Sequence, residues 1–162
     1  SAVRRQIDYR KVHMPVFGKL FKIIYTARFA RTLSSLYSSG MPIATALGIA
    51  GNTIGNSYVE GQFEQVVALV RSGIPMSQAL REVDGLQKKL ASTILVGEES
   101  GRLDVMLDSI ALSLEADAEE ATKRMVTLME PLLIMMMAVV VGFIMIAVML
   151  PIYESYSAIE NS

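Results

Sequence analysis

One uncharged stretch, Leu132–Leu150, constrains the fold of this chain more than any other part of the sequence. Its 19 residues read LLIMMMAVVVGFIMIAVML and include no charged side chain, no Asn, Gln, Ser or Thr, and no proline. At about 1.5 Å per residue, such a helix spans roughly 28 Å, close to the hydrocarbon thickness of a bilayer. A buried core helix is the alternative. Apolar residues on every face, rather than in one stripe, favour a transmembrane helix, which we assign to residues 131–152.

The distribution of charge gives this helix an orientation. All 15 Lys and Arg residues precede Leu132, and the segment after it carries only Glu154 and Glu160. Because basic residues are retained on the cytoplasmic side of a membrane, we expect residues 1–130 in the cytoplasm. Residues 153–162 then form a short external tail.

Composition excludes several classes of protein. The net charge of −1 gives no sign of nucleic-acid binding. The absence of cysteine excludes a disulfide scaffold and a zinc–thiolate site. The sequence begins SAVRRQIDYR, without an initiator Met or a signal-peptide core, and we expect a fragment of a longer protein.

The first 22 residues are basic, with six Lys or Arg residues against the single acid Asp8. Two interpretations stand beside each other. Residues 1–18 are either a basic juxtamembrane leader near anionic headgroups or a solvated, partly disordered segment. His13 has no second His and no Cys nearby, so we expect an ordinary surface histidine.

Residues 19–130 are predicted to form an antiparallel six-helix bundle, so the fold class is all-α. Apolar residues recur at helical spacing, and Gly or Pro separates the runs. We expect Val96 to join Leu86, Leu90, Ile94 and Leu95 on a core face. The predicted helices cover residues 19–39, 42–50, 57–72, 75–83 and 86–101, followed by one long helix from Leu103.

An internal repeat marks the turns between these helices. SGMPI at residues 39–43 recurs as SGIPM at residues 72–76, each followed two residues later by Ala-Leu. Gly supplies a positive φ at a helix end and Pro presets φ for the next helix. Ser100–Leu103 is a looser copy without proline.

The last helix is predicted to continue from the bundle into the membrane, because no glycine lies between Leu103 and Pro131. Pro131 is the one interruption, and we expect a kink there, with Glu130 beside it at the membrane boundary. Ala138 and Gly142 form a small-xxx-small pair that would let another membrane helix approach closely.

The densest polar group is Gly97–Asp104. As a chemical site, Glu98, Glu99 and Asp104 could bind a hard cation or act as acid and base. As structure, Gly101 ends a helix and Asp104 begins the next, while Arg102 pairs with a neighbouring carboxylate. Adjacent Glu98 and Glu99 point about 100° apart on a helix, which favours the structural interpretation. We therefore predict no catalytic, cofactor-binding or metal-binding residue, and a structural or interface motif comprising Gly97, Glu98, Glu99, Ser100, Gly101, Arg102, Asp104, Glu130, Pro131 and Gly142.

These segments resemble a known family. GEESGRLDVML (97–107), EPLLI (130–134) and VVVGFIMIAVMLPIY (139–153) are similar to the inner-membrane platform proteins of type II secretion and type IV pilus machines. PVFGKL (15–20), ARFARTLSSLYSSGMPI (27–43) and SGIPMSQAL (72–80) extend the match. Leu86-Gln87 departs from the Phe-Pro that family members often have before the fifth helix. The resemblance implies the second of two cytoplasmic six-helix domains, followed by the last of three membrane helices.

The resemblance also implies a function. Such proteins are scaffolds rather than enzymes. They contact a hexameric cytoplasmic assembly ATPase and other inner-membrane assembly proteins, self-associate, and help pass pilin or pseudopilin subunits into a filament. Arg28 and Arg31 are weaker candidates for contact with the ATPase or a second copy.

Two other functions stay open at this point. One is a membrane-anchored cation-binding sensor or carboxylate-dependent enzyme that uses Glu98, Glu99 and Asp104. The other is a single-span receptor or transporter accessory, against which the uncharged membrane stretch argues.

Overall fold

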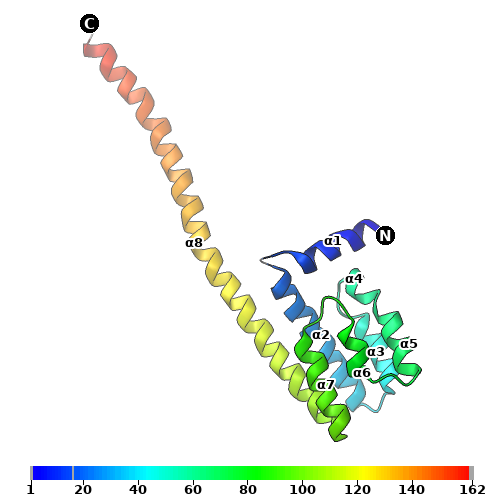
Figure 1. Cartoon of the computed structure of the whole chain (residues 1–162). Helices are drawn as coiled ribbons and strands as arrows, with labels where there is room; N and C mark the ends of the chain where they lie inside the picture. The colour runs from blue at the N-terminus through cyan, green and yellow to red at the C-terminus, as the bar shows by residue number, and fades with distance from the viewer. Residues whose placement is uncertain (1, 16, 161–162) are drawn as a thin grey trace. The chain divides into compact units, whose positions relative to one another are not determined.

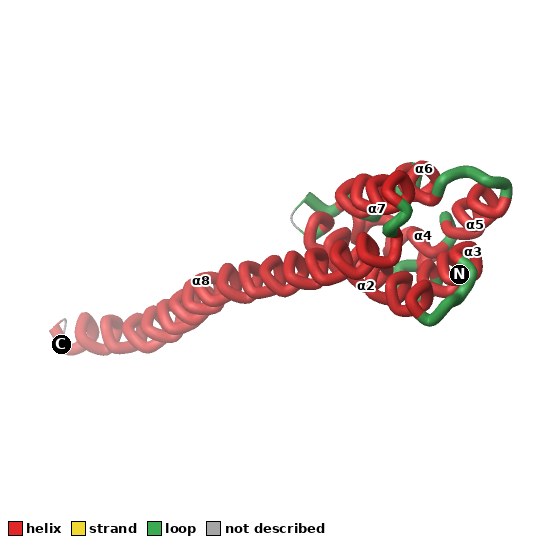
Figure 2. Tube along the Cα trace, turned by 90° about the horizontal axis from the view of Figure 1, so that it is seen from below, coloured by secondary structure: helices red, strands yellow, loops and turns green. Residues whose placement is uncertain are grey.

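The computed structural model describes residues 2–15 and 17–160, and over this part of the chain every regular element is a helix (Figure 1). The predicted all-α class is confirmed. Figure 2 shows the helices joined by loops that are mostly short. The helices are α1 (Ala2–His13), α2 (Gly18–Ser38), α3 (Ile43–Gly51), α4 (Ser57–Glu60), α5 (Phe63–Arg71), α6 (Met76–Arg81), α7 (Lys88–Ser100) and α8 (Leu103–Glu160).

The chain divides into two units between Ala121 and Thr122. The first unit is a helical bundle that contains α1 to α7 and the start of α8. Its core draws on α2, α3, α7 and α8 together, since side chains from all four are fully buried in one cluster. The largest of them are Phe29, Leu33, Leu47, Leu90, Ile94, Leu107 and Leu114, and Ile54 from the segment between α3 and α4 joins them.

The turns of the bundle have the geometry that the repeat predicts. Gly40, Gly73 and Gly101 have φ values of +87°, +96° and +66°. After each glycine, a backbone N–H reaches back five residues, and the N···O distances are 3.0–3.2 Å. This closure is the glycine-terminated Schellman motif. It recurs in the third copy, which lacks the proline, so the glycine rather than the proline defines the turn.

The predicted helix over residues 57–72 is wrong in one respect, because it is two helices, α4 and α5. At the break, the N–H of Gln62 donates to the Val59 carbonyl at 3.1 Å, a tighter turn than an α-helix makes. The Gln62 side chain bonds both backbone groups of Asp84, at 2.9 Å each. This contact, 22 residues away in the sequence, accompanies the break. The prediction for Val96 is also wrong, since 52% of it is exposed.

Residues 2–13, for which the sequence left two interpretations, form the helix α1. Asp8 and Val12 of this helix are 4% and 2% exposed. The Asp8 carboxylate accepts hydrogen bonds from the Ser57 N–H at 3.0 Å and from its hydroxyl at 2.5 Å. His13 lies at the surface, with its Nε2 3.2 Å from an Asp84 carboxylate oxygen. The structure therefore shows a helix that is attached to the bundle at these residues, rather than a disordered segment.

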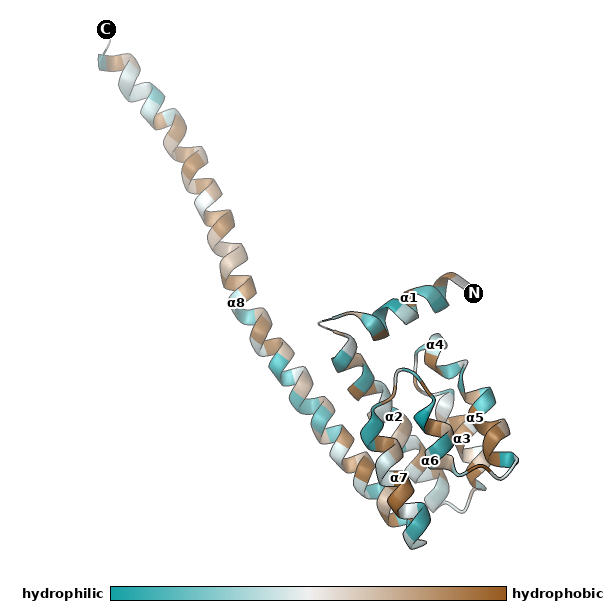
Figure 3. Cartoon of the chain, viewed as in Figure 1, coloured by the Kyte–Doolittle hydropathy of each residue, from teal (hydrophilic) through white to brown (hydrophobic). Residues whose placement is uncertain are grey.

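The second unit consists of the remainder of α8, which continues as helix through Pro131 and Pro151 to Glu160. Each large apolar residue of Leu132–Leu150 exposes more than half of its surface. Figure 3 shows this part of α8 in brown and pale tones, without the teal of polar residues. Of the helices described, α8 is long and apolar enough to cross a membrane, and its most apolar window has a mean hydropathy of 3.0. The predicted kink at Pro131 stays a prediction.

Candidate functional site

The predicted motif Gly97–Asp104 occupies the end of α7, the turn and the first residues of α8. Gly97 is buried where the two helices meet. A Cβ at this position would lie 3.0 Å from the Met106 Cβ and 3.1 Å from the Leu103 Cα. Any larger residue would push the start of α8 away from α7. Gly97 thus sets the spacing of the two helices.

Glu98 stabilises a different helix, α6. Its carboxylate accepts hydrogen bonds from the Met76 N–H at 2.6 Å, the Ser77 N–H at 3.3 Å and the Ser77 hydroxyl at 2.5 Å. Pro75, at the N-cap of α6, has no side-chain acceptor to offer. A carboxylate at a helix N-terminus satisfies free N–H groups and interacts favourably with the helix dipole. Glu98 therefore caps α6 from 21 to 22 residues away in the sequence.

The remaining motif residues lie at the surface. Glu99, Ser100, Arg102 and Asp104 are partly or fully exposed, and the Ser100 hydroxyl donates to the Val96 carbonyl at 2.7 Å. Arg102 was expected to pair with a neighbouring carboxylate. Within residues 2–15 and 17–160 it forms no ion pair. Glu98 is engaged with α6, while Glu99 is exposed. In the described part of the chain, no three His, Cys, Asp or Glu side chains are placed to hold a metal ion.

Arg28 and Arg31 make contacts within the bundle. The Arg31 guanidinium donates from Nε and Nη2 to the two Glu115 carboxylate oxygens, at 2.7 and 2.6 Å. Its Nη1 also lies 3.4 Å from an Asp108 oxygen. The hydrogen bond from Arg31 holds the pKa of Glu115 below its ordinary value, against a smaller opposing effect of burial. Arg28 donates to the Ile54 carbonyl at 3.0 Å. Both arginines thus tie α2 to other parts of the bundle.

The three other predicted site residues, Glu130, Pro131 and Gly142, lie on α8 in the second unit. All three are exposed. In the part of the chain that the structure describes, no atom lies within 4 Å of the position that a Cβ on Gly142 would occupy, apart from the helix's own backbone and the adjacent residues. The fold thus brings the Gly97–Asp104 residues together at the junction of α7 and α8 in the first unit.

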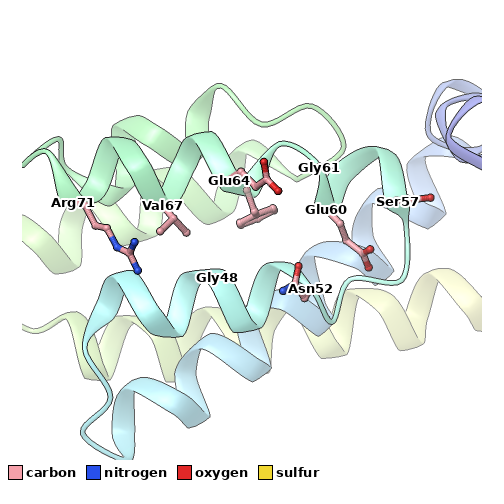
Figure 4. Close-up of a pocket in the computed structure, with 9 residues that line it drawn as sticks. Gly48, Asn52, Ser57, Glu60, Gly61, Glu64, Val67 and Arg71 are labelled. Carbon is pink, nitrogen blue, oxygen red and sulfur yellow. The ribbon is translucent and has the colours of Figure 1, made fainter. Parts of the chain in front are cut away.

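A groove that the sequence did not suggest runs along α3 and the α4–α5 pair (Figure 4). Its volume is about 550 Å³. Arg71 lies at one end, and Asn52 and Glu60 lie toward the other. The groove follows the seam where α3 approaches α5, and the approach is close, because a Cβ on Gly51 would lie 2.5 Å from the Phe63 ring. The sequence signal that could have indicated it is the pair Gly48 and Gly51 on one face of α3.

The structure therefore defines a class: a helical bundle whose last helix continues into an uncharged segment long enough to span a bilayer. The family model described as type II secretion system (T2SS), protein F, matches residues 29–151. The chain belongs to this family, and the resemblance inferred from the sequence is confirmed.

Curated relatives agree with this assignment. The type IV pilus assembly protein PilC of Thermus thermophilus is 38% identical over 152 residues, which cover 93% of this chain and 37% of the relative. The type II secretion system protein F of Aeromonas hydrophila is 34% identical over 151 residues, covering 93% and 39%. PilC of Pseudomonas aeruginosa is 30% identical over 151 residues, covering 93% and 40%. The chain thus spans about two fifths of the length of these relatives.

Proposed function

We propose that this chain is the membrane-proximal part of an inner-membrane platform scaffold in a type IV pilus or type II secretion machine. Residues 19–130 form its cytoplasmic bundle, 131–152 its membrane helix and 153–162 a short external tail. It carries out no catalysis. It couples a cytoplasmic hexameric assembly ATPase to the extraction of pilin or pseudopilin subunits from the membrane.

The observation that supports this proposal is the continuity of α8. Leu107, Ile110, Ala111 and Leu114 of this helix are buried in the bundle core, and Leu132–Leu150 of the same helix is uncharged. No loop interrupts the helix between them. A helix keeps its hydrogen-bonded backbone along its length, except where a proline such as Pro131 lacks the N–H. In this proposal, a force applied to the bundle reaches the bilayer along this one helix.

The names of the relatives support the proposed partners, and the charge pattern supports the proposed orientation. The relatives are named for pilus assembly and for type II secretion. All 15 basic residues precede Leu132, which supports a cytoplasmic bundle and an external C-terminus. Besides the ATPase and the pilin or pseudopilin subunits, we propose other inner-membrane assembly proteins and a second copy of the chain as partners.

Two insertions between Ala121 and Thr122 of the parent protein test force transmission. A flexible seven-residue Gly/Ser segment breaks the helix. Seven helix-forming residues of Ala, Glu and Lys lengthen it by two turns and change the rotation of the two parts by only about 20°. We expect the flexible insertion to abolish piliation or secretion at normal protein level. The helical insertion retains function. Normal activity with the flexible insertion would refute the proposal.

A further inference from the structure

The part of α1 that is buried in the bundle is narrow, although the exposed Tyr9 and His13 also contact Tyr58 and Asp84. Among residues 3–15, only Asp8 and Val12 are buried. They are four positions apart and so lie on one line along the helix. Polar bonds hold this line in place: the Asp8 carbonyl accepts from the Asn56 amide at 3.2 Å, and its carboxylate accepts from Ser57. Val3 and Ile7, on the opposite side of α1, are exposed.

That opposite side combines apolar and basic residues. At about 100° per residue, Val3 and Ile7 lie roughly 120–160° away from the buried line. Val3 is 66% exposed and Ile7 is 52% exposed. Arg10 lies beside Val3, about 180° from the buried line, and Arg4 borders Ile7 at the edge of this face, about 60° from the buried line. Figure 3 shows the resulting mixture of teal and brown along α1.

The arginines that border the apolar pair are available for an external partner. Arg4 and Arg10 are exposed and form no ion pair within residues 2–15 and 17–160. Lys11, which lies near Arg4, is 3.5 Å from an Asp8 oxygen and is thus engaged at the buried line.

This arrangement matches the chemistry of an anionic lipid surface. An interfacial helix places apolar side chains at the boundary of headgroups and acyl chains, and its basic residues contact anionic headgroups. The chain contains its own candidate membrane span. A bilayer that α8 crosses would be a partner that the chain itself brings close. We propose that the outward face of α1, formed by Val3, Arg4, Ile7 and Arg10, binds an anionic bilayer surface.

The proposal requires α8 to lie in a membrane but does not require any role in pilus assembly or secretion. Because α1 is fixed to α4 through Asp8, such a contact would give the bundle a second attachment to the bilayer besides α8. The proposal extends the prediction of a basic juxtamembrane leader, because it names the residues that contact lipid and the charge of the lipid that they bind.

The absence of cysteine allows a direct test on the full chain. A spin label is placed at Ile7→Cys, and the protein is reconstituted in nanodiscs of phosphatidylcholine with or without phosphatidylglycerol. Accessibility to oxygen, which partitions into lipid, is compared with that to a water-soluble nickel complex. The control position is Gln65→Cys on α5, which is exposed and is not part of the proposed face.

We expect the label at position 7 to become several-fold less accessible to nickel, and more accessible to oxygen, when phosphatidylglycerol is present. The label at position 65 should not respond. Arg4→Gln/Arg10→Gln should abolish the response at position 7, whereas Arg71→Gln/Arg81→Gln should preserve it. Raised salt should weaken it, since exposed charges are screened.

Three results would overturn the proposal. The first is equal nickel access at position 7 in both kinds of nanodisc. The second is protection from nickel and oxygen alike, which indicates a protein partner. The third is spin–spin broadening at position 7 that disappears on dilution with unlabelled chain, which indicates a second copy. Hydrogen exchange over residues 2–13 checks that α1 stays folded in the arginine variants.

Discussion

At the scale of single residues, Glu98 has the clearest structural task, because three donors at the start of α6 depend on its carboxylate. Glu98→Ala leaves the Met76 and Ser77 N–H groups without this acceptor, and we expect a loss of about 1–3 kcal/mol in the free energy of unfolding. Glu99→Ala, at the exposed neighbouring position, should stay within about 0.5 kcal/mol. Hydrogen exchange over residues 74–81 provides the measurement. Equal protection of α6 in the two variants would contradict the capping role.

A second residue-scale prediction concerns the ion pair of Arg31 and Glu115. The pKa of Glu115 is held below its ordinary value of 4.5, chiefly by the hydrogen bond from Arg31. A lowered pKa in the folded state adds stability above pH 4.5, and this contribution is lost as the pH falls through the folded-state pKa. Glu115→Gln should thus cost stability at pH 7 and cost less at pH 3.

Since the two side chains are 36% and 43% exposed, the cost at pH 7 should not exceed about 1 kcal/mol. Urea unfolding in detergent, monitored by the circular dichroism of the tyrosines, measures this loss of stability. In an Arg31→Gln background, the pH dependence of the Glu115→Gln effect should shrink. A cost that is the same at both pH values, with Arg31 present, counts against the pair.

The contacts of these two carboxylates also show where sequence reasoning stops. The sequence predicts that Gly101 ends a helix and that Glu98 and Glu99 point apart, because both follow from helix geometry. It does not predict that Glu98 reaches Ser77, or that Arg31 reaches Glu115 at a separation of 84 residues. Such pairings depend on how whole helices pack, and neither partner carries a local pattern that identifies the other.

At the scale of elements, α3 and α5 approach closely because two glycines of α3 face α5. A Cβ on Gly51 would lie 2.5 Å from a ring carbon of Phe63, whereas a Cβ on Gly48 would lie 3.6 Å from Val67. Gly51→Ala should therefore lower the stability of the bundle by about 1–3 kcal/mol through overpacking. Gly48→Ala should raise it by up to about 1 kcal/mol, since alanine favours a helix.

The two alanine variants differ by one turn of the same helix and are each other's control. The midpoint of urea unfolding should fall for Gly51→Ala and hold or rise for Gly48→Ala. A fall of the same size for both would mean that the close approach at Phe63 is not what distinguishes the two positions.

Most helix boundaries could be predicted because the chain marks them locally. Gly40, Gly73 and Gly101 each end a helix with a positive φ, and Pro42 and Pro75 each precede one. The break between α4 and α5 could not be predicted, because Gln62 leaves the helix beside a tertiary contact with Asp84. The groove between α3 and α5 was missed for a related reason: glycine spacing indicates a close approach but not which helix approaches.

At the scale of the whole molecule, the sequence predicted the class of protein through its strongest signal, the uncharged 19-residue stretch. A bundle core and a bilayer both require apolar residues. The bundle takes them at helical spacing on one face, as with Leu107, Ile110 and Leu114, and the proposed membrane helix takes them on every face. That difference in pattern can be read without coordinates. The sequence does not predict which surface of a membrane helix contacts a partner, because the same apolar side chains suit both lipid and protein contacts.

Gly142 is the position on α8 where that question can be tested. In lipid, helices associate through close packing of small residues rather than through the hydrophobic effect. Gly142 and Ala138, one turn apart, are the proposed surface, and among residues 2–15 and 17–160 a Cβ on Gly142 would meet no atom within 4 Å beyond its own helix. We expect Gly142→Cys and Ala138→Cys to form disulfide-linked dimers on mild oxidation in native membranes. Ile144→Cys, about 200° around the helix from Gly142, should not. Gly142→Leu should lower cross-linking at Ala138→Cys, since its side chain separates the two backbones. Only monomer at position 142, or equal cross-linking at all three cysteine positions, would exclude this face as the self-association surface.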